Sequence, residues 1–285
     1  AVEASATSQA GGGHAHCGAM IYLGDNWPKS YRNSLMMANI HGNRVNLDHL
    51  RRDGSGFIAA HGRDVIFAND PWFRGINLRY GPDGAVYLID WYDPNACHRT
   101  SPEIWDRSNG RLYRVRYGEL APVPVNLAAA SDEELTQLHE HENDWFVRTA
   151  RRVLQTRYTG QDSASGDATA TKAAVRAALW QHATDAGRPT DRRLRYLWTC
   201  HALQSLSDAE ALTLLQDRDE NLRAWAMQLL TDRPRPSGDE LPPLGAEVLA
   251  KLRELSVSES SSRVRLYLAS LLQRVPLDDR RQLAP

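Results

Sequence analysis

The feature that most constrains this chain of 285 residues is a change of residue pattern near residue 120. Over residues 14–118, short apolar runs alternate with turn segments rich in Gly, Pro, Asn and Asp, a pattern typical of β-strands. Residues 121–124 read APVP, which is typical of a stiff linker. Beyond them the apolar residues recur with a helical period of about 3.6 residues. The sequence therefore predicts a β part followed by a helical part.

The β part contains one clear hairpin. Two strand patterns, at residues 75–80 and 85–90, flank the sequence GPDG, in which Pro82 favours a turn and Gly84 can adopt a positive φ. Weaker strand patterns lie at residues 19–23, 34–39, 44–50, 56–60 and 111–117. Six or more short strands at this spacing favour a propeller, a sandwich or a barrel.

The helical part is predicted to consist of paired helices. Ser131 and Glu134 form the pattern of a capping box at its start. Helical patterns follow at residues 132–141, 144–157, 168–184, 191–205, 208–216, 219–231, 246–256 and 262–274. The second helix of each pair carries an apolar residue followed by an arginine, at Arg148, Arg195, Arg223 and Arg265. This resembles HEAT repeats, in which the arginine braces the next turn, so a structural role is expected for these four side chains.

Composition excludes several classes of protein. The 34 basic and 35 acidic residues give a net charge of -1 without a long basic run, which argues against a nucleic-acid partner. No apolar run approaches the ~20 residues that a membrane span requires. The 3 cysteines are too few for a disulfide framework or a four-thiolate zinc site. Residues 1–13 carry no initiator Met and no signal-peptide pattern, so we expect a disordered or truncated lead-in.

Histidines cluster in the β part, which raises the expectation of a binding or catalytic site there. Those before residue 100 are His14, His16, His41, His49, His61 and His98. In an extended strand, His14 and His16 would share one face and could contribute to a metal site if further ligands converged. The alternative is a pair of polar residues at the rim of a sheet.

Two further segments offer equipment for a polar ligand. In NIHGNR, Asn39, His41 and Asn43 would lie on the same side if the segment were extended, and the alternative is a tight turn that uses Asn and Gly for conformation. In PWFRGI, Arg74 could bind a carboxylate or stack on a ring, which suits an anionic aromatic cofactor. The alternative for Arg74 is a structural role.

Acidic residues follow the strongest strand directly. Asp90, Asp93 and His98 in DWYDPNACH could hold a hard cation such as calcium, although the spacing is not that of an EF-hand and a solvated turn is the alternative. The chain contains no CxxCH, P-loop, GxGxxG or GxSxG motif.

These motifs together resemble a known family. The run GHAHCGAMIYLGDNW, followed by NIHGNR, DPWFRGINLRYGPDGAVYLIDWYDP and NGRLYRVRYG, is similar to the C-terminal part of glucose/sorbosone dehydrogenase-type β-propellers. More closely, it resembles the large planctomycete-type membrane-bound dehydrogenase-like proteins. The resemblance covers about residues 12–118 and implies a β + α fold: the last two or so blades of a β-propeller at 14–118, a linker at 119–130, and a HEAT-like solenoid at 131–285.

The resemblance also implies an activity. Such a propeller would hold pyrroloquinoline quinone (PQQ) with calcium, oxidise a CH–OH group of a sugar or alcohol, and pass electrons to a c-type haem domain outside this chain. The implied location is extracytoplasmic, either periplasmic or in the cell envelope. The implied catalytic His and main calcium ligands come from blades that precede this chain, so we expect the chain alone to be inactive.

The resemblance assigns roles to particular residues. Arg74 matches the arginine that contacts the carboxylates of the quinone. His41 or Arg44 in NIHGNR would supply a further basic contact, with Asn39 and Asn43 beside it, although the family's Lys is absent here. The rim position near the cofactor-stacking residues would be taken by His14 and His16.

A second hypothesis belongs to another class of protein. Propellers and helical solenoids both present concave recognition surfaces, and a fold by itself does not define a function. The alternative to the dehydrogenase is therefore a non-catalytic propeller/HEAT binding module for carbohydrate or for a protein partner, the latter on the helical solenoid.

Overall fold

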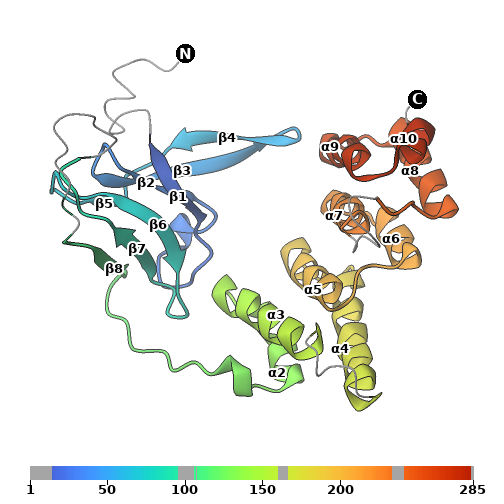
Figure 1. Cartoon of the computed structure of the whole chain (residues 1–285), viewed down its shortest axis with the longest axis horizontal. Coiled ribbons are helices and arrows are strands. Elements are labelled where there is room, and N and C mark those ends of the chain that lie inside the picture. The colour runs from blue at the N-terminus through green and yellow to red at the C-terminus, as the bar shows by residue number, and fades with distance from the viewer. Residues whose placement is uncertain (1–14, 96–105, 107, 160–165, 233–240, 284–285) are drawn as a thin grey trace. The chain divides into compact units, whose positions relative to one another are not determined.

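The computed structural model describes residues 15–95, 106, 108–159, 166–232 and 241–283 (Figure 1). The chain divides into two compact units. The sheet unit comprises Ala1–Arg52, Phe57–Asn126 and His141–Phe146, and the helical unit comprises Asp53–Gly56, Leu127–Glu140 and Val147–Pro285. Antiparallel sheets followed by helices confirm the β + α fold class. Within the described ranges, no helix combines the length and the apolarity needed to cross a membrane.

The sheet unit contains two antiparallel sheets. The larger has the order β1-β2-β3-β4, with β5 paired to β3, and the smaller has the order β6-β7-β8. The strands are β1 (His16–Ile21), β2 (Leu35–Asn39), β3 (Arg44–Asp53), β4 (Gly56–His61), β5 (Ile66–Phe67), β6 (Gly75–Tyr80), β7 (Val86–Asp90) and β8 (Arg111–Val115). The strand patterns match the sequence predictions except for β5, which is too short to produce a pattern. A 3-10 turn covers Lys29–Tyr31.

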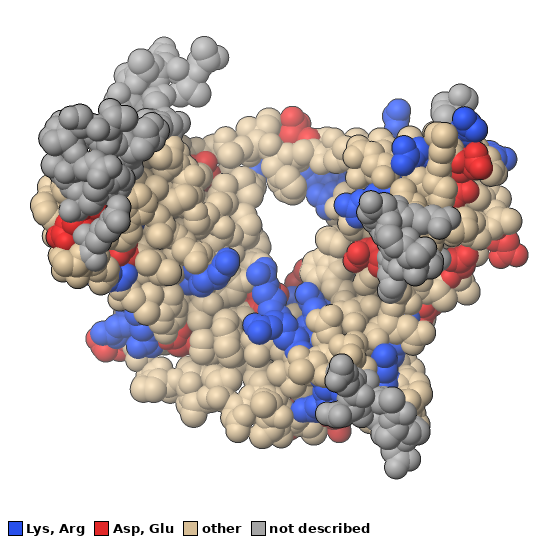
Figure 2. All heavy atoms as spheres, in the orientation of Figure 1, with Lys and Arg blue, Asp and Glu red and all other residues tan. Residues whose placement is uncertain are grey.

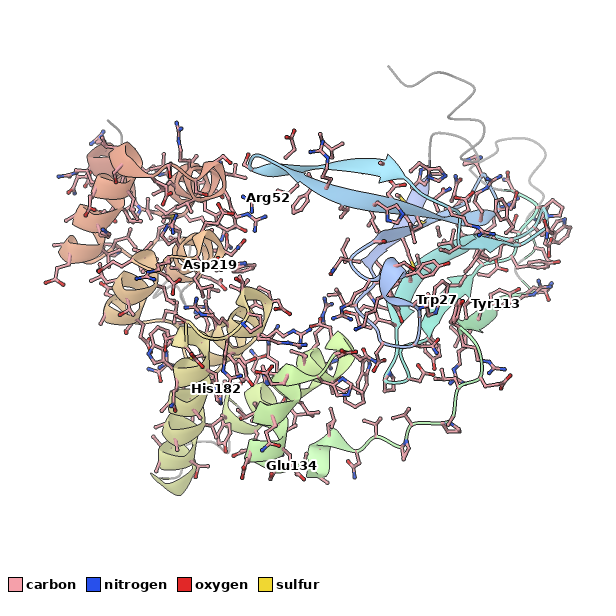
Figure 3. The ribbon with its side chains drawn as sticks, turned by 180° about the vertical axis from the view of Figure 1, so that it is seen from behind. Trp27, Arg52, Tyr113, Glu134, His182 and Asp219 are labelled. Carbon is pink, nitrogen blue, oxygen red and sulfur yellow. The ribbon has the colours of Figure 1, made fainter. Side chains whose placement is uncertain are left out.

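Alternation along the strands builds the core of the sheet unit. In β3, Val45 and Leu47 are buried on one face, so Arg44, Asn46 and Asp48 lie on the other. The core cluster consists of Met20, Tyr22, Trp27, Met36, Val45, Leu47, Phe73, Leu78, Tyr80, Val86 and Leu88. Trp27, labelled in Figure 3, donates from its indole Nε1 to the carbonyl oxygen of Val115 at 3.3 Å. One face of the larger sheet is thus committed to packing and the other carries polar groups.

The GPDG turn closes the predicted hairpin. The backbone N–H of Gly81 donates to Ala85 O at 3.0 Å, and β6 pairs antiparallel with β7. Gly84 has a φ of 71°, and its carbonyl oxygen accepts a hydrogen bond of 2.7 Å from the fully buried Tyr22 hydroxyl. The turn is therefore anchored to the core as well as shaped by its own residues.

Helices of the helical unit alternate between two layers, with α3, α5, α7 and α9 side by side in one and α4, α6 and α8 in the other (Figure 1). They are α2 (Asp132–Gln137), α3 (Asp144–Thr159), α4 (Gly166–Thr184), α5 (Thr190–Leu203), α6 (Asp208–Leu215), α7 (Glu220–Leu230), α8 (Ala246–Ser258), α9 (Ser262–Leu271) and α10 (Leu277–Leu283). Short 3-10 segments cover Leu127–Ala129, Leu138–Glu140 and Leu272–Arg274.

The predicted helices agree with these bounds to within a few residues. The capping box is present, since the Ser131 hydroxyl accepts from Glu134 N while the Glu134 carboxylate accepts from Ser131 N. The segments predicted at 132–141 and 262–274 each end in a tighter 3-10 turn. The sequence analysis missed α10, whose seven residues carry too few apolar positions to show a period.

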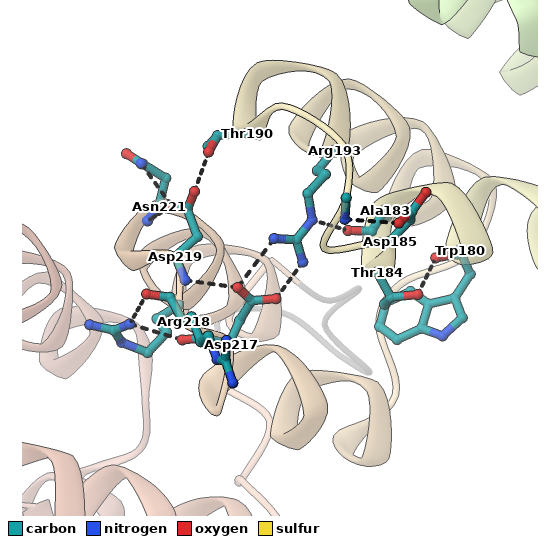
Figure 4. Close-up of polar contacts among 12 residues, drawn as sticks. Trp180, Ala183, Thr184, Asp185, Thr190, Arg193, Asp217, Arg218, Asp219 and Asn221 are labelled. Atoms are coloured by element: carbon teal, nitrogen blue, oxygen red, sulfur yellow. Dashed lines mark hydrogen bonds and ion pairs between the residues drawn. The ribbon is translucent and has the colours of Figure 1, made fainter.

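Arginines connect neighbouring elements of the helical unit, toward the next repeat as predicted for Arg223 but toward a preceding segment for Arg195. Arg223 forms a two-pronged ion pair with Glu259, at 2.9 and 3.0 Å, and the buried Arg195 donates to the carbonyl oxygen of His139 at 3.1 Å. Arg193, which the repeat pattern did not single out, pairs with Asp217 and donates to Ala183 O (Figure 4).

We expect the helical unit to lose stability as the pH falls below about 6.5. Burial lowers the pKa of His201 and of His182 below the ordinary value of 6.5. Below about pH 6.5 the unfolded state binds more protons than the folded state, because its histidines have the higher pKa. The free energy of unfolding therefore decreases as the pH is lowered through this range. The urea midpoint of the helical circular dichroism signal should be lower at about pH 5.5 than at about pH 7.5.

The control is His201→Asn, whose amide oxygen can accept the Leu206 N–H now bound to the imidazole. It should reduce the difference between the two midpoints. Equal midpoints at the two pH values for the unaltered chain would contradict the expectation.

Candidate functional site

Polar side chains form one connected network on the face of the larger sheet that points away from the core. We define the polar face network as His16, Asn39, Arg44, Asn46, Asp48, His61 and Asp64. The register explains the grouping, because His16 pairs with Asn39 across β1 and β2, and Asn39 pairs with Arg44 across β2 and β3. Directly opposed residues of antiparallel strands share a face.

Asn46 occupies the buried centre of this network. Its amide oxygen accepts from Asn39 Nδ2 at 3.0 Å and lies 3.1 Å from His16 Nε2. Its amide nitrogen donates to Asp64 Oδ1 at 2.6 Å. Asn46 is 2% exposed, so these bonds hold the side chains around it in fixed positions.

Asp64 connects the centre to the accessible edge. Its Oδ2 pairs with Arg44 at 2.9 Å, and its Oδ1 lies 3.5 Å from His61 Nε2. The other ring nitrogen of His61 lies 3.3 Å from Asp48 Oδ1. The side chain of Asp64 is only 5% exposed whereas that of His61 is 43% exposed, so the imidazole presents the network to solvent between two carboxylates.

An aromatic ring borders the network. The guanidinium carbon of Arg44 lies 4.7 Å from the centre of the Phe67 ring, and Phe67 is 54% exposed. The accessible edge thus combines an apolar ring with hydrogen-bond donors and acceptors. Ligand sites in proteins commonly have this composition, with a few fixed polar groups beside apolar surface.

Arg74 forms a separate buried cluster. Its guanidinium is enclosed by backbone and donates to the carbonyl oxygens of Phe73 at 2.8 Å, Pro94 at 3.1 Å and Ile40 at 3.4 Å. Arg74 is 4% exposed. Burial lowers the pKa of its guanidinium, and the nearby carboxylates of Asp93, Asp90 and Asp70 oppose that shift.

This arrangement does not fit the expected contact with a quinone carboxylate. A carboxylate ligand needs guanidinium N–H groups that face accessible space, whereas Nη1 and Nη2 of Arg74 donate to three backbone carbonyls and its Nε–H, which has no acceptor among the described groups, is buried. The contacts favour the structural alternative for Arg74, which joins the turn at Ile40 to the segment around Pro94.

The NIHGNR segment is a turn, so the extended conformation considered for it is wrong. Residues 40–43 connect β2 to β3, and Asn43 has a φ of 50°. The Asn39 side-chain oxygen accepts from Gly42 N at 2.8 Å, which stabilises the turn. Asn43 Nδ2 donates to Phe73 O at 2.9 Å and Pro71 O at 3.2 Å. Asn39, His41 and Asn43 therefore do not line one side of a strand, because local side-chain bonds favour a turn.

The carboxylates expected to bind calcium accept backbone N–H groups instead. Asp90 Oδ1 accepts from Arg74 N at 2.7 Å and Tyr92 N at 2.9 Å. Asp93 accepts from Asn95 N at 2.8 Å and Asp106 N at 3.1 Å. Calcium needs several convergent oxygen ligands, and of the carboxylate oxygens of Asp90 and Asp93 only Asp90 Oδ2 is buried without a hydrogen-bond partner among the described groups. Across the described residues, no three His, Cys, Asp or Glu side chains converge as metal ligands. His14 and His98 lie outside the described residues.

The structure thus brings together three of the predicted site residues, His16, Asn39 and Arg44, and adds others. Asp48 and Asn46 could have been found from the alternation of β3, since they share a face with Arg44. No pattern marks Asp64, which lies in a loop between β4 and β5 and reaches the network only through the fold.

Comparison with known proteins adds one match. A family profile described as a domain of unknown function (DUF7133) matches residues 2–119, a region that contains the whole polar face network. No curated protein matches the chain. No solved structure matches it either.

Proposed function

We propose that residues 14–118 are about two blades of a β-propeller of the glucose/sorbosone dehydrogenase type and that residues 131–285 are a HEAT-like solenoid. Consecutive antiparallel strands in the order β1-β2-β3-β4 support the first part, since propeller blades are four-stranded sheets. Alternating helices in two layers, joined by arginine contacts such as Arg223–Glu259, support the second.

The polar face network is proposed to bind the hydroxyl groups of a sugar or alcohol. The observation that carries this proposal is the accessible imidazole of His61 between the carboxylates of Asp48 and Asp64. A hydroxyl group donates one hydrogen bond and accepts others, so it needs both kinds of partner close together. Phe67 at the edge offers an apolar surface to the C–H groups of the same molecule.

The proposal has two forms. In the non-catalytic form, the chain is part of a carbohydrate-binding module. Two observations support this form: His61 lies between Asp48 and Asp64 at an accessible edge, whereas Arg74 is buried and donates to backbone carbonyls. In its catalytic form, the parent protein is an extracytoplasmic PQQ- and calcium-dependent dehydrogenase linked to a c-type haem domain. The convergence of His16, Asn39 and Arg44 on one face favours that second candidate.

Binding is tested by saturation-transfer NMR of the full chain with glucose, sorbitol and ethanol. At least one of these ligands should bind, and His61→Gln should weaken its binding by roughly tenfold, the equivalent of about one lost hydrogen bond. His49→Gln is the matched control, because His49 is also an exposed histidine but lies on the opposite face of β3. Equal losses in the two variants, or no binding of any ligand, would refute the site.

The two forms are separated by oxidation. The bound sugar or alcohol is incubated with the full-length parent protein, PQQ, calcium and an artificial electron acceptor dye, because blades outside this chain would have to supply the catalytic groups. The non-catalytic form predicts binding without dye reduction. Ligand-dependent dye reduction that is lost in His61→Gln would instead establish the catalytic form.

A further inference from the structure

A pocket of about 210 Å³ lies between α8, α9 and α10 of the helical unit, which are grouped together in Figure 1. Four leucines supply most of its lining: Leu252 on α8, Leu268 on α9, Leu272 in the 3-10 segment that follows α9, and Leu283 on α10. Two polar side chains, Ser256 on α8 and Arg265 on α9, also line it. We call this space the leucine pocket.

Hydrogen bonds outside the pocket hold two of its walls in place. Arg253 on α8 donates from Nε to the carbonyl oxygen of Gln282 on α10 at 2.9 Å. The buried Asp279 carboxylate on α10 accepts from the backbone N–H of Leu244, just before α8, at 3.0 Å. These contacts fix α8 relative to α10, so the leucine pocket is preformed, as ligand pockets in proteins commonly are.

The size and lining of the pocket suit a short hydrocarbon chain. Leu252 is fully buried and Leu283 is 5% exposed, whereas Leu268 and Leu272 remain partly accessible. An apolar cavity of about 150 Å³ holds a benzene molecule, so this larger space can hold an alkyl chain. A peptide would bring backbone N–H and C=O groups, and a lining of leucines would leave most of them without partners, which is costly. The lining therefore favours a small amphiphile over a peptide.

Arg265 gives the pocket a positive charge. Its side chain is exposed, and no described residue forms an ion pair with it or accepts a hydrogen bond from it. The arginine at the equivalent position of the preceding repeat, Arg223, instead forms the two-pronged pair with Glu259. Among the described residues, Arg265 thus lacks the bracing contact expected for it, and its guanidinium is available to a ligand.

Acidic side chains near the pocket have other partners. Figure 2 shows Lys and Arg side chains mixed with Asp and Glu over this end of the helical unit. Glu254 on α8 pairs with Lys251 at 2.8 Å, and Asp278 on α10 pairs with Arg281 at 3.3 Å. None of the described residues that line the pocket is acidic. The pocket therefore combines an apolar interior with one cation that no carboxylate neutralises, which favours an anionic head group.

We propose that the leucine pocket binds a medium-chain fatty acid, with its hydrocarbon chain among the leucines and its carboxylate beside Arg265. A guanidinium can bind a carboxylate through two parallel N–H···O bonds. Each CH₂ group that enters the pocket leaves water, so the affinity should rise with chain length until the pocket is full. This inference is independent of the sugar or alcohol site on the sheet unit.

The first test titrates the full chain with sodium octanoate, below the concentration at which it forms micelles, in an isothermal calorimeter. Octanoate should bind, and butyrate should bind roughly tenfold more weakly or worse, because it buries fewer CH₂ groups. Octylammonium chloride has the same chain length and the opposite charge, so it should also bind roughly tenfold more weakly or worse. Equal affinities for octanoate and octylammonium, or no binding of octanoate, would overturn the proposal.

The second test removes the charge. Arg265→Gln should weaken octanoate binding by roughly tenfold, since it removes a hydrogen-bonded charge from the head group, and it should not weaken octylammonium binding. Arg218→Gln is the matched control, because Arg218 is also an exposed arginine of the helical unit but does not line the pocket. Equal octanoate affinities in Arg265→Gln and Arg218→Gln would overturn the proposal.

The third test fills the pocket without changing its charge. Ala269 on α9 lines the pocket and is exposed, so in Ala269→Phe a phenyl ring can take the place of the hydrocarbon chain while the helices stay folded. Octanoate binding should be lost with the helical circular dichroism signal unchanged. Ala209→Phe on α6 is the matched control, since Ala209 is exposed and does not line the pocket. Equal octanoate affinities in the two phenylalanine variants would place the ligand elsewhere and overturn the proposal.

Discussion

Replacing Asp217 with alanine is expected to lower the free energy of unfolding of the helical unit by about 3–5 kcal/mol. The Arg193 side chain is only 5% exposed and is paired with Asp217, which is 16% exposed. Removal of the carboxylate leaves a buried, uncompensated charge, which costs far more than the pair contributes. Asp217 Oδ1 also accepts from Asp219 N at 2.8 Å, in the turn that begins α7 (Figure 4). Urea unfolding followed by helical circular dichroism measures the loss.

The control is a pair of the same type at the surface. Asp278 and Arg281 are 86% and 71% exposed, so Asp278→Ala should cost less than about 1 kcal/mol. A double variant, Asp217→Leu with Arg193→Met, should recover much of the lost stability, because apolar groups of similar volume can replace a buried pair. Similar losses in Asp217→Ala and Asp278→Ala would show that Arg193 is solvated.

Gly84→Ala is expected to destabilise the sheet unit by about 2–5 kcal/mol. Gly84 has a φ of 71°, which is unfavourable for any residue with a β-carbon. A methyl group there would also overlap the backbone nitrogen of Asn26 and the Asp25 side chain. The neighbouring backbone cannot move freely, because Trp27 N donates to the buried Tyr22 hydroxyl at 2.9 Å and that hydroxyl donates to Gly84 O. Urea unfolding followed by near-UV circular dichroism checks the loss.

Gly118→Ala separates the two causes. Gly118 also has a positive φ, of 66°, but nothing lies within 4 Å of the position that a β-carbon would take. Its substitution should cost only the conformational part, about 1–2 kcal/mol. Were the two glycine variants equally unstable, the contact between the GPDG turn and Asn26 would have no energetic role.

The sequence predicted the local structure well because local physics dominates it. The GPDG hairpin follows from Pro and Gly dihedral preferences, and the start of α2 follows from the capping box of Ser131 and Glu134. A local contact also explains why the NIHGNR segment is a turn and not extended. The Asn39 side-chain oxygen accepts a hydrogen bond from Gly42 N, which an extended strand would not allow. Elements such as β5 and α10 were missed because they are too short to show a period.

The candidate site was only partly predictable. His16, Asn39 and Arg44 were singled out from their residue types and from the family resemblance, and they do lie together. Arg74 was singled out in the same way, yet its guanidinium is enclosed by carbonyl oxygens. The type of a residue indicates which groups its side chain can bind. Only the contacts in the folded protein show whether the side chain binds the backbone or remains available to a ligand.

The sequence by itself determined the succession of strands and helices, since dihedral preferences, caps and apolar periods act over a few neighbouring residues. Only the tertiary structure decided which polar groups meet. Asp64 accepts a hydrogen bond from Asn46, which lies 18 residues away in the chain. Trp198 on α5 contacts Trp225 on α7, although a whole helix, α6, separates them in the sequence. Such contacts depend on strand register and helix packing, which place residues distant in the chain side by side and which no local pattern encodes.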